Sequence, residues 1–237
     1  MTEWGDAEFE KWGEGVSVSV RRAMQNSRNG GGNDFSYSLH QLARRGAKRM
    51  GNRECVELAK AFVHLPNLSY LNLSGNRIGD RGAIALGAAL RELPKLTLVN
   101  LSNNSIGDKG AVALARALEG LPELSNLSLD HNQIGDKGAT ALCRVIKGHA
   151  NMTEVGLSHN SISDLGIGPI AQAVTGMPYL NKLTLDHNSI GDVGAQALLK
   201  ALPSMPCMVE LPLAGNDISP SIMANIERIV PRVTEEE

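Results

Sequence analysis

The chain has 237 residues, of which 42% are hydrophobic and only 3% aromatic, and its formal net charge is −2. This composition supports a continuous aliphatic core, and the near-zero charge gives no overall field that favours nucleic acid or a membrane surface. Three scattered cysteines without metal-ligand spacing (Cys55, Cys143 and Cys207) indicate a reducing compartment. Because no apolar run approaches the roughly 18 residues of a membrane span and the acidic N-terminus lacks a signal-peptide pattern, we expect a cytoplasmic protein with no membrane partner.

Residues 1–38 form an N-terminal extension that matches no later part of the chain and ends in the glycine-rich stretch 29–34. The extension contains Trp4, Phe9 and Trp12, although disordered tails are usually poor in aromatic residues. These three side chains are therefore candidate partner-binding residues. The sequence leaves open whether the extension packs on the rest of the chain, binds a partner or does neither.

Residues 39–64 are predicted to be a degenerate repeat whose helix caps the N-terminal end of the core. Met50-Gly51-Asn52 aligns with Ile78-Gly79-Asp80 of the first full repeat, and an apolar helical stripe follows. The densest basic run of the chain lies here, at Arg44, Arg45, Lys48, Arg49 and Arg53. No aromatic residue interleaves this run, so its helical spacing favours a solvated cap face, or a protein partner with an acidic surface, over nucleic acid.

Residues 65–230 contain six units that superimpose at a constant offset of 28 residues. Each unit has apolar residues, an asparagine and an isoleucine at fixed spacing, starting at Leu68, Leu96, Leu124, Met152, Leu180 and Met208. A chain that keeps one period this strictly stacks one structural unit on copies of itself.

One unit consists of a predicted short strand followed by a helix. Apolar residues alternate around Leu71, as in a strand, and the recurring Asn76 can satisfy backbone groups of the bend that follows. Asp80 is the predicted N-cap of a helix from about Gly82 to Leu90, with an i,i+4 leucine stripe that must be buried. The equivalents of Asp80 are Asp108, Asp136, Asp164 and Asp192.

Repetition of a strand and a helix requires a parallel sheet with helices on one side. Strands lie about 4.7–4.9 Å apart and helices about 8–10 Å, so the helical side is longer and the stack curves. We therefore predict an α/β fold, a right-handed solenoid with the sheet on the concave face of a horseshoe and the helices on its convex face. Ser219-Pro220 predicts a last helix to about Val230, which makes the sixth unit the C-terminal cap, and 231–237 is an acidic tail.

The pattern Leu-x-x-Leu-x-Leu-x-x-Asn-x-Ile-Gly-Asp-x-Gly-Ala-x-Ala-Leu resembles the ribonuclease-inhibitor-like class of leucine-rich repeats over about residues 65–230. The class includes ribonuclease inhibitor, Ran GTPase-activating protein, NOD-like receptor sensor domains and several cytoskeletal and ciliary proteins. The resemblance implies a scaffold that binds proteins, without a specific function. No catalytic residue carries over from the class, because only scaffold positions match.

The sequence does not assemble the residues of an enzyme. Gly79-Asp80-Arg81-Gly82 recurs as a structural turn and lacks the Gly-Lys-Ser/Thr of a phosphate-binding loop. Cys143 falls at a helix position that is Ala115 one unit earlier, as expected for a small packing residue. We predict a non-enzymatic protein with no cofactor, no metal and no small-molecule substrate.

His131, His159 and His187 occupy one position in three consecutive units, beside Asp130 and Asp186. Histidine and aspartate can ligate metals, and parallel stacking places equivalent positions of neighbouring units about 5 Å apart. The same position holds glycine or asparagine in the other units, which favours an exposed corner of tolerant sequence over a metal site.

The residues between the buried leucines are predicted to line the concave wall and to bind a partner there. An apolar pair in the first two units is followed by mainly acidic positions, and the candidate residues are Tyr70, Leu98, Asp130, Glu154, Lys182, Asp186 and Glu210. The outer helices carry two basic rows, formed by Arg81, Lys109 and Lys137 and by Arg116, Arg144 and Lys200. We expect a protein partner with a basic stretch facing the concave wall; ordinary solvated faces are the alternative.

The sequence therefore predicts a protein–protein interaction scaffold, or a structural subunit of a larger assembly that is cytoskeletal or ciliary by analogy. A GTPase regulator similar to Ran GTPase-activating protein and a protein inhibitor of an enzyme are the alternatives. The scaffold is favoured because the related GTPase-activating domain is longer, with a larger acidic tail, and ribonuclease inhibitor has many more cysteines and a fuller horseshoe.

Overall fold

The computed structural model describes residues 49–62 and 65–230. Predictions that concern Trp4, Phe9, Trp12 and the acidic tail lie outside the described residues. The elements in chain order are α4 (Asn52–Ala61), β1 (Tyr70–Asn72), α5 (Asp80–Leu90), β2 (Leu98–Asn100), α6 (Asp108–Leu118), β3 (Asn126–Ser128), α7 (Asp136–Gly148), β4 (Glu154–Gly156), α8 (Asp164–Val174), β5 (Lys182–Thr184), α9 (Asp192–Ala201), the 3-10 helix η3 (Leu202–Ser204) and α10 (Pro220–Glu227).

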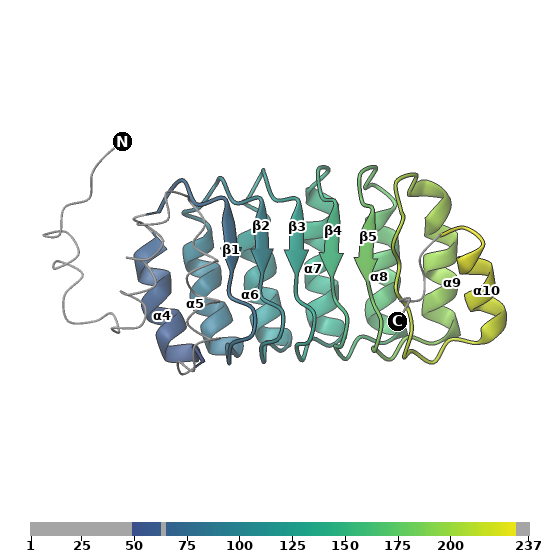
Figure 1. Ribbon diagram of the computed structural model, residues 1–237, viewed down its shortest axis with the longest axis horizontal. Helices are drawn as coiled ribbons and strands as arrows, with labels where there is room; N and C mark the ends of the chain where they lie inside the picture. The colour runs from purple at the N-terminus through teal and green to yellow at the C-terminus, as the bar shows by residue number, and fades with distance from the viewer. Residues whose placement is uncertain (1–48, 63–64, 231–237) are drawn as a thin grey trace, which may run out of the picture.

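The strands form one parallel sheet in the order β1-β2-β3-β4-β5, with the helices in a row on one side of it (Figure 1). Every pairing keeps the 28-residue register, as in Tyr70 opposite Leu98 and Glu154 opposite Lys182. The sixth unit joins the sheet through a single bridge between Lys182 and Glu210. The parallel α/β solenoid predicted from the period is confirmed, with the sheet on the concave face and the helices on the convex face.

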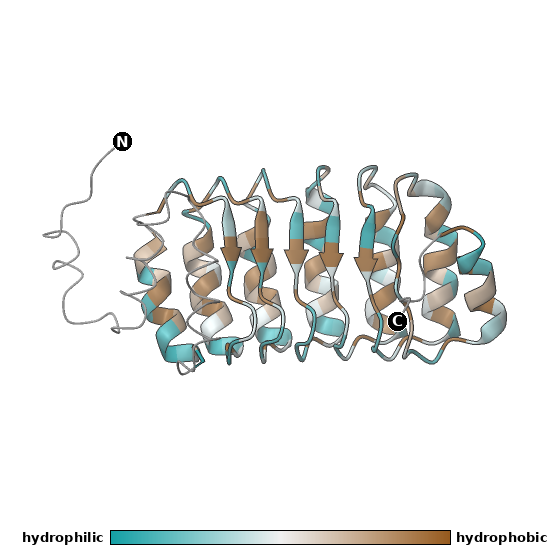
Figure 2. Cartoon of the chain, in the orientation of Figure 1, coloured by the Kyte–Doolittle hydropathy of each residue, from teal (hydrophilic) through white to brown (hydrophobic). Residues whose placement is uncertain are grey.

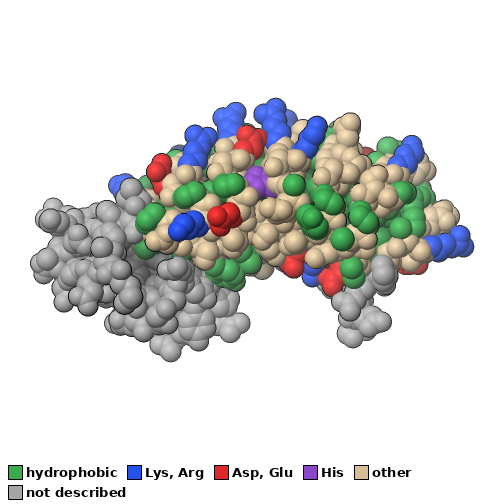
Figure 3. All heavy atoms as spheres, turned by 90° about the horizontal axis from the view of Figure 1, so that it is seen from above, with side chains coloured by type: hydrophobic (Ala, Val, Ile, Leu, Met, Phe, Trp, Pro, Cys, Tyr) green, Lys and Arg blue, Asp and Glu red, His purple; other side chains and the backbone are tan. Residues whose placement is uncertain are grey.

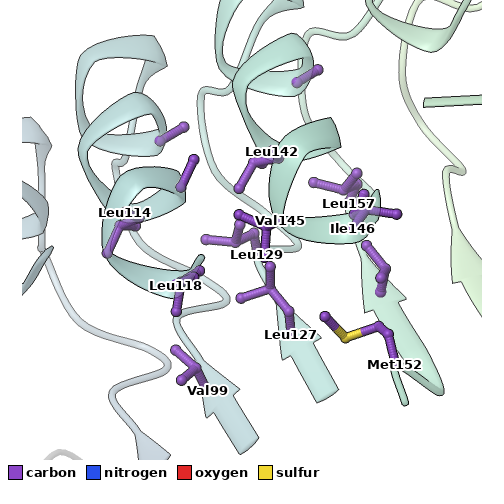
Figure 4. Close-up of a cluster of buried hydrophobic side chains, with 14 of the residues drawn as sticks. Val99, Leu114, Leu118, Leu127, Leu129, Leu142, Val145, Ile146, Met152 and Leu157 are labelled. Atoms are coloured by element: carbon purple, nitrogen blue, oxygen red, sulfur yellow. The ribbon is translucent and has the colours of Figure 1, made fainter. Parts of the chain in front are cut away.

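The core lies between the sheet and the helices and is almost entirely aliphatic. In most strands the middle residue is buried while its two neighbours are half-buried, which is the period-two pattern of a one-sided sheet. Hydrophobic residues recur on the strands and on the helices in every unit (Figure 2). Figure 4 shows how side chains of three successive units meet, among them Leu114, Leu118, Leu127, Leu142 and Ile146. All five are buried, which confirms the predicted i,i+4 helical stripe.

The recurring asparagines form a ladder between units, as the sequence predicts. The Asn104 side chain donates from Nδ2 to the carbonyl oxygens of Leu101 at 2.9 Å and of Leu73, in the preceding unit, at 3.0 Å. Its Oδ1 accepts a hydrogen bond from the Ile78 N–H at 3.0 Å. One amide thus satisfies backbone groups of two units at a bend where no strand partner is present.

The predicted role of Asp80 as the N-cap of its own helix is wrong by one position. The N-cap of α5 is Gly79, and Asp80 is the first helical residue, two residues before the predicted helix start at Gly82. The Asp80 Oδ1 atom instead accepts hydrogen bonds from Gly107 N at 2.9 Å and Gly110 N at 2.8 Å, at the start of the next helix. The Gly110 N–H has no partner inside its own helix, so Asp80 caps the helix of the following unit, and Asp108 and Asp164 do the same for theirs.

This capping explains the glycine at the third helical position. A Cβ atom at Gly110 would lie 2.8 Å from both Asp80 Oδ1 and the Ile106 Cγ2 atom and 2.9 Å from the Ala83 Cβ. The approach of the preceding unit therefore leaves no room for a side chain at Gly110.

The two ends of the described stack are closed by helices. At the N-terminal end α4 buries Cys55 and Leu58 against the core and packs on α5. At the C-terminal end α10 begins with Ser219 as N-cap and Pro220 as first residue, as predicted, and ends at Glu227, three residues before the predicted end. The Ser219 hydroxyl does not bond to the first-turn amides, whereas its N–H donates to Asp192 Oδ1 at 2.7 Å, so the ladder of aspartates reaches this last helix.

Candidate protein-binding surface

The concave wall is built from the first and third residues of each strand, because the middle residue faces the core. The first positions are the half-buried Tyr70, Leu98 and Lys182 and the exposed Glu154, and Glu210 continues the column in the sixth unit. Since the register aligns these positions, the structure brings all five predicted residues of this column together on one wall.

Tyr70 and Leu98 lie directly opposite each other on β1 and β2. Both side chains are half-buried, so they present an apolar surface at the N-terminal end of the wall without being part of the core. Residues of this kind can anchor a partner, because burying an aromatic or aliphatic side chain in an interface lowers the free energy of the complex.

Lys182 and Glu210 form an ion pair, with 2.8 Å between Nζ and Oε2. The pKa of Lys182 is raised, chiefly by its hydrogen bond with Glu210. These two charges largely compensate each other, so Glu154 is the acidic group of this column that is exposed and has no ion pair among the described residues.

Asp130 lies two residues after the end of β3 and is tied into the wall. Its Oδ1 accepts hydrogen bonds from Thr184 Oγ1 at 2.7 Å and Ser158 N at 2.9 Å, and its Oδ2 from Ser102 Oγ at 3.3 Å. The carboxylate lies so close to Gly156 that a side chain at that position would displace it. Because hydrogen bonds from three other units hold this carboxylate, it stabilises the wall and is less available to a partner.

Asp186, at the equivalent position after β5, is buried, with 7% of its surface exposed. Its Oδ1 accepts a hydrogen bond from the Ser158 hydroxyl. The alternation of residues along the strand predicted that Asp130 and Asp186 face the concave side, but the hydroxyl groups of neighbouring units draw both carboxylates onto the wall. The acidic surface offered to a partner is therefore smaller than the sequence indicates.

The three histidines lie at the corner that follows the strands, where the backbone is left-handed. Their φ angles are 52° at His131, 50° at His159 and 51° at His187, and Asn103 and Gly215 have positive φ at the same corner of their units. The glycine and asparagine seen there in other units suit this conformation.

The imidazole rings stack on one another along the corner. The ring centroids are 3.9 Å apart between His131 and His159 and 4.1 Å apart between His159 and His187, with the planes 13° and 17° from parallel. His159 Nε2 lies 3.7 Å from Asp186 Oδ2. Loss of solvation is the main cause that lowers the pKa of His159, followed by repulsion from the two flanking histidines, which together outweigh the attraction of Asp186 and Asp130.

The outer wall carries exposed cations, and Lys and Arg side chains gather along one long margin of the molecule (Figure 3). The row of Arg81, Lys109 and Lys137 at the helix starts continues in the next two units with Leu165 and Val193, which are 78% and 70% exposed. The sequence prediction missed this change from basic to apolar. Reading the same position through all the units would have found it.

Two of the three cysteines have no role at a surface. Burial raises the pKa of Cys55 to about 12 and that of Cys143 to about 11, and Cys207 is exposed. The Cys143 thiol donates to the Ala139 carbonyl oxygen at 3.2 Å, which agrees with its prediction as a packing residue. All three thiols are free.

Each of the described helices is too short or too polar to cross a bilayer.

The parallel strands, the helices on one side and the asparagine ladder define a solenoid repeat protein. Comparison with protein families agrees with the geometry, because the Leucine Rich repeat family matches residues 64–87, 92–115, 124–143, 148–171 and 176–199. The chain is a leucine-rich repeat protein. The match does not resolve the subtype, so the ribonuclease-inhibitor-like class stays a prediction.

Solved structures show the same fold. Actin-binding site 2 of leiomodin-1 superimposes with a TM-score of 0.53 at 19% sequence identity, over 64% of this chain and 87% of its own. An internalin from Listeria monocytogenes superimposes with a TM-score of 0.50 at 20% identity, over 77% of this chain and half of its own. At these identities the likeness concerns the fold alone. A comparison with curated protein sequences returned no match.

Proposed function

We propose that this protein is a non-enzymatic scaffold that holds a protein partner along its concave wall. The observation that supports this most is the alignment of Tyr70 and Leu98 at one end of the wall with the exposed Glu154 two strands further on. A partner that places an apolar side chain on the first two and a lysine or arginine beside the third matches this arrangement. The proposed partner is thus a protein element with a basic stretch.

The proposed setting is the reducing cytoplasm, where the three free thiols are stable. A subunit of a cytoskeletal or ciliary assembly is the form of scaffold we favour. Leiomodin-1, whose solved domain shares this fold, is described as actin-binding, so actin is the first named partner to test.

The test compares Glu154→Lys and Tyr70→Ala with Arg81→Glu as a control on the outer wall. Affinity capture followed by mass spectrometry, together with co-sedimentation with actin filaments, measures binding by each variant. We expect both concave-wall variants to lose the partner that the wild type captures, while the control retains it. Asp130 and Asp186 are unsuitable for charge reversal, because their replacement also breaks hydrogen bonds inside the wall.

Retention of the partner by both concave-wall variants, with loss in Arg81→Glu, would move the interface to the outer wall and refute the proposal. Acceleration of GTP hydrolysis by a small GTPase in the presence of the wild-type protein would instead favour the GTPase-regulator alternative.

A further inference from the structure

One corner of the solenoid brings two imidazoles and a carboxylate together. One ligand-competent atom from each of His159, Asp186 and His187 lies within 4.8 Å of the other two. Imidazole nitrogen and carboxylate oxygen are ligands that zinc and other first-row divalent ions prefer. The two histidines come from consecutive units, so the fold, and not a local motif, assembles this group.

The carboxylate is held in an orientation that suits a ligand. Asp186 is buried, and its Oδ1 is occupied by the hydroxyl of Ser158. Its other oxygen, Oδ2, lies 3.7 Å from His159 Nε2. One oxygen is therefore anchored and the other is directed at the histidines, as in metal sites where a neighbouring group fixes the ligand.

The neighbouring histidine pair lacks this carboxylate. Asp186 lies 27 residues after His159, whereas the residue 27 residues after His131 is Ser158. His131 and His159 stack as closely as His159 and His187 do, but Ser158 offers a hydroxyl where Asp186 offers a charged oxygen. Three histidines thus share the corner, and one pair has a complete ligand set.

The histidines can present free lone pairs. A neutral imidazole has one ring nitrogen without a proton, and this is the form that binds metals. The His187 side chain is exposed, and the missing Cβ at Gly215 leaves the space that its ring occupies.

The stacked rings must turn before they can share an ion. An imidazole binds a metal in the plane of its ring, and the planes of His159 and His187 are 17° from parallel with centroids 4.1 Å apart. The His187 side chain is exposed, so its ring can turn about the Cβ–Cγ bond, and binding of an ion between the two rings requires such a turn.

We propose that His159, Asp186 and His187 form a binding site for one divalent transition-metal ion, with Zn²⁺ as the preferred ion. Three protein ligands leave the fourth tetrahedral position open to water or to a side chain of a partner. The site lies at the carboxyl ends of β4 and β5, at the margin of the concave wall.

The experiment titrates the full chain with ZnCl2 by isothermal calorimetry and with CoCl2 by visible absorption, which reports tetrahedral coordination. His159→Asn and His187→Asn remove one ligand each, and Asn103 shows that asparagine is accepted at this left-handed corner. His131→Asn is the matched control, since it makes the same change at the same corner outside the ligand set. Far-UV circular dichroism verifies that each variant is folded.

We expect the wild type and His131→Asn to bind one ion with affinities within about threefold of each other. Each ligand variant should bind at least tenfold more weakly, a loss at the scale known for disturbed metal sites. Asp186→Asn retains an acceptor for the Ser158 hydroxyl and should weaken binding in the same way. Absence of saturable binding by the wild type would overturn the proposal, as would an equal loss in His131→Asn and the ligand variants.

Discussion

Replacing Asp108 with alanine removes the atom that links two successive units at a helix start. Asp108 Oδ1 accepts hydrogen bonds from Gly135 N at 2.9 Å and Gly138 N at 2.8 Å. Gly135 is the N-cap of α7 and Gly138 its third residue, so neither N–H has a partner inside its own helix. Alanine leaves both donors without their acceptor in a partly buried junction.

The expected loss follows from the two bonds. A hydrogen bond to a charged group contributes about 1.5–3 kcal/mol, and loss of an N-cap side chain costs about 0.5–2 kcal/mol. Because Asp108 is half-buried and water can replace part of what is lost, we expect Asp108→Ala to lower the free energy of unfolding by about 2–3 kcal/mol. Asp108→Asn keeps an acceptor oxygen and should cost only the interaction of the charge with the helix dipole, about 0.3–1 kcal/mol.

The first junction within the described residues supports this difference. There Asn52 takes the place of the aspartate, and its Oδ1 accepts hydrogen bonds from Gly79 N at 2.8 Å and Gly82 N at 2.9 Å. Urea unfolding followed by far-UV circular dichroism gives the change in free energy for each variant. The reasoning is refuted if Asp108→Ala lies within about 0.5 kcal/mol of the wild type, the range typical of surface substitutions, or if both variants lose equal stability.

Three further predictions concern glycine, thiol and imidazole groups. Gly110→Ala should lower the free energy of unfolding by about 1–3 kcal/mol, because its Cβ would lie 2.8 Å from a carboxylate oxygen of the preceding unit. Gly148→Ala is the control: its Cβ would have open space around it, so this variant should be neutral or stabilising in the same urea assay. At pH 8 a thiol reagent should modify Cys207 quickly and the two buried cysteines only after unfolding; two fast thiols in the native state would contradict the burial. An NMR titration should give His159 a pKa below the 6.5 usual for histidine. The contribution of His159 to the free energy of unfolding is therefore fully present above about pH 6.5 and is lost as the pH falls through the lowered pKa of the folded state. His131→Asn should raise this pKa, and an unchanged value would show that repulsion between the rings has no effect.

The strands, the helices and the buried positions were predictable because the same positions are buried in every 28-residue unit. A leucine such as Leu127 must face the core in every unit, so the period and the residue type fix its place. The asparagine ladder was also predictable, since an amide that recurs at a bend has both a donor and an acceptor for the backbone.

The partners of the aspartates were not predictable from local rules. The N-cap rule considers one helix at a time and placed Asp80 at the start of its own helix, whereas the carboxylate reaches an amide 27 residues further along the chain. The contact depends on how closely two units stack, and the glycine at the third helical position was the sequence signal for that approach.

The alternation of residues along the strands predicted which side of the sheet Asp130 and Asp186 face, but it did not predict their side-chain rotamers. Asp130 and Asp186 lie on the predicted side, but the hydroxyls that hold them come from units 28 and 54 residues away. The same is true of the histidine column, whose positions follow from the period. The stacking of the rings and the approach of Asp186 Oδ2 depend on side-chain torsions that the sequence does not specify.

The uniform junction chemistry bears on how such a molecule can grow. Each asparagine from Asn104 onward bonds to the unit before it through Oδ1 and Nδ2, and each aspartate at a helix start bonds through Oδ1 to the unit after it. A tandem duplication of one 28-residue segment would meet matching donors and acceptors on both sides. The length of the binding wall can therefore change by whole units in evolution or in design, while the residues that decide what it binds vary independently.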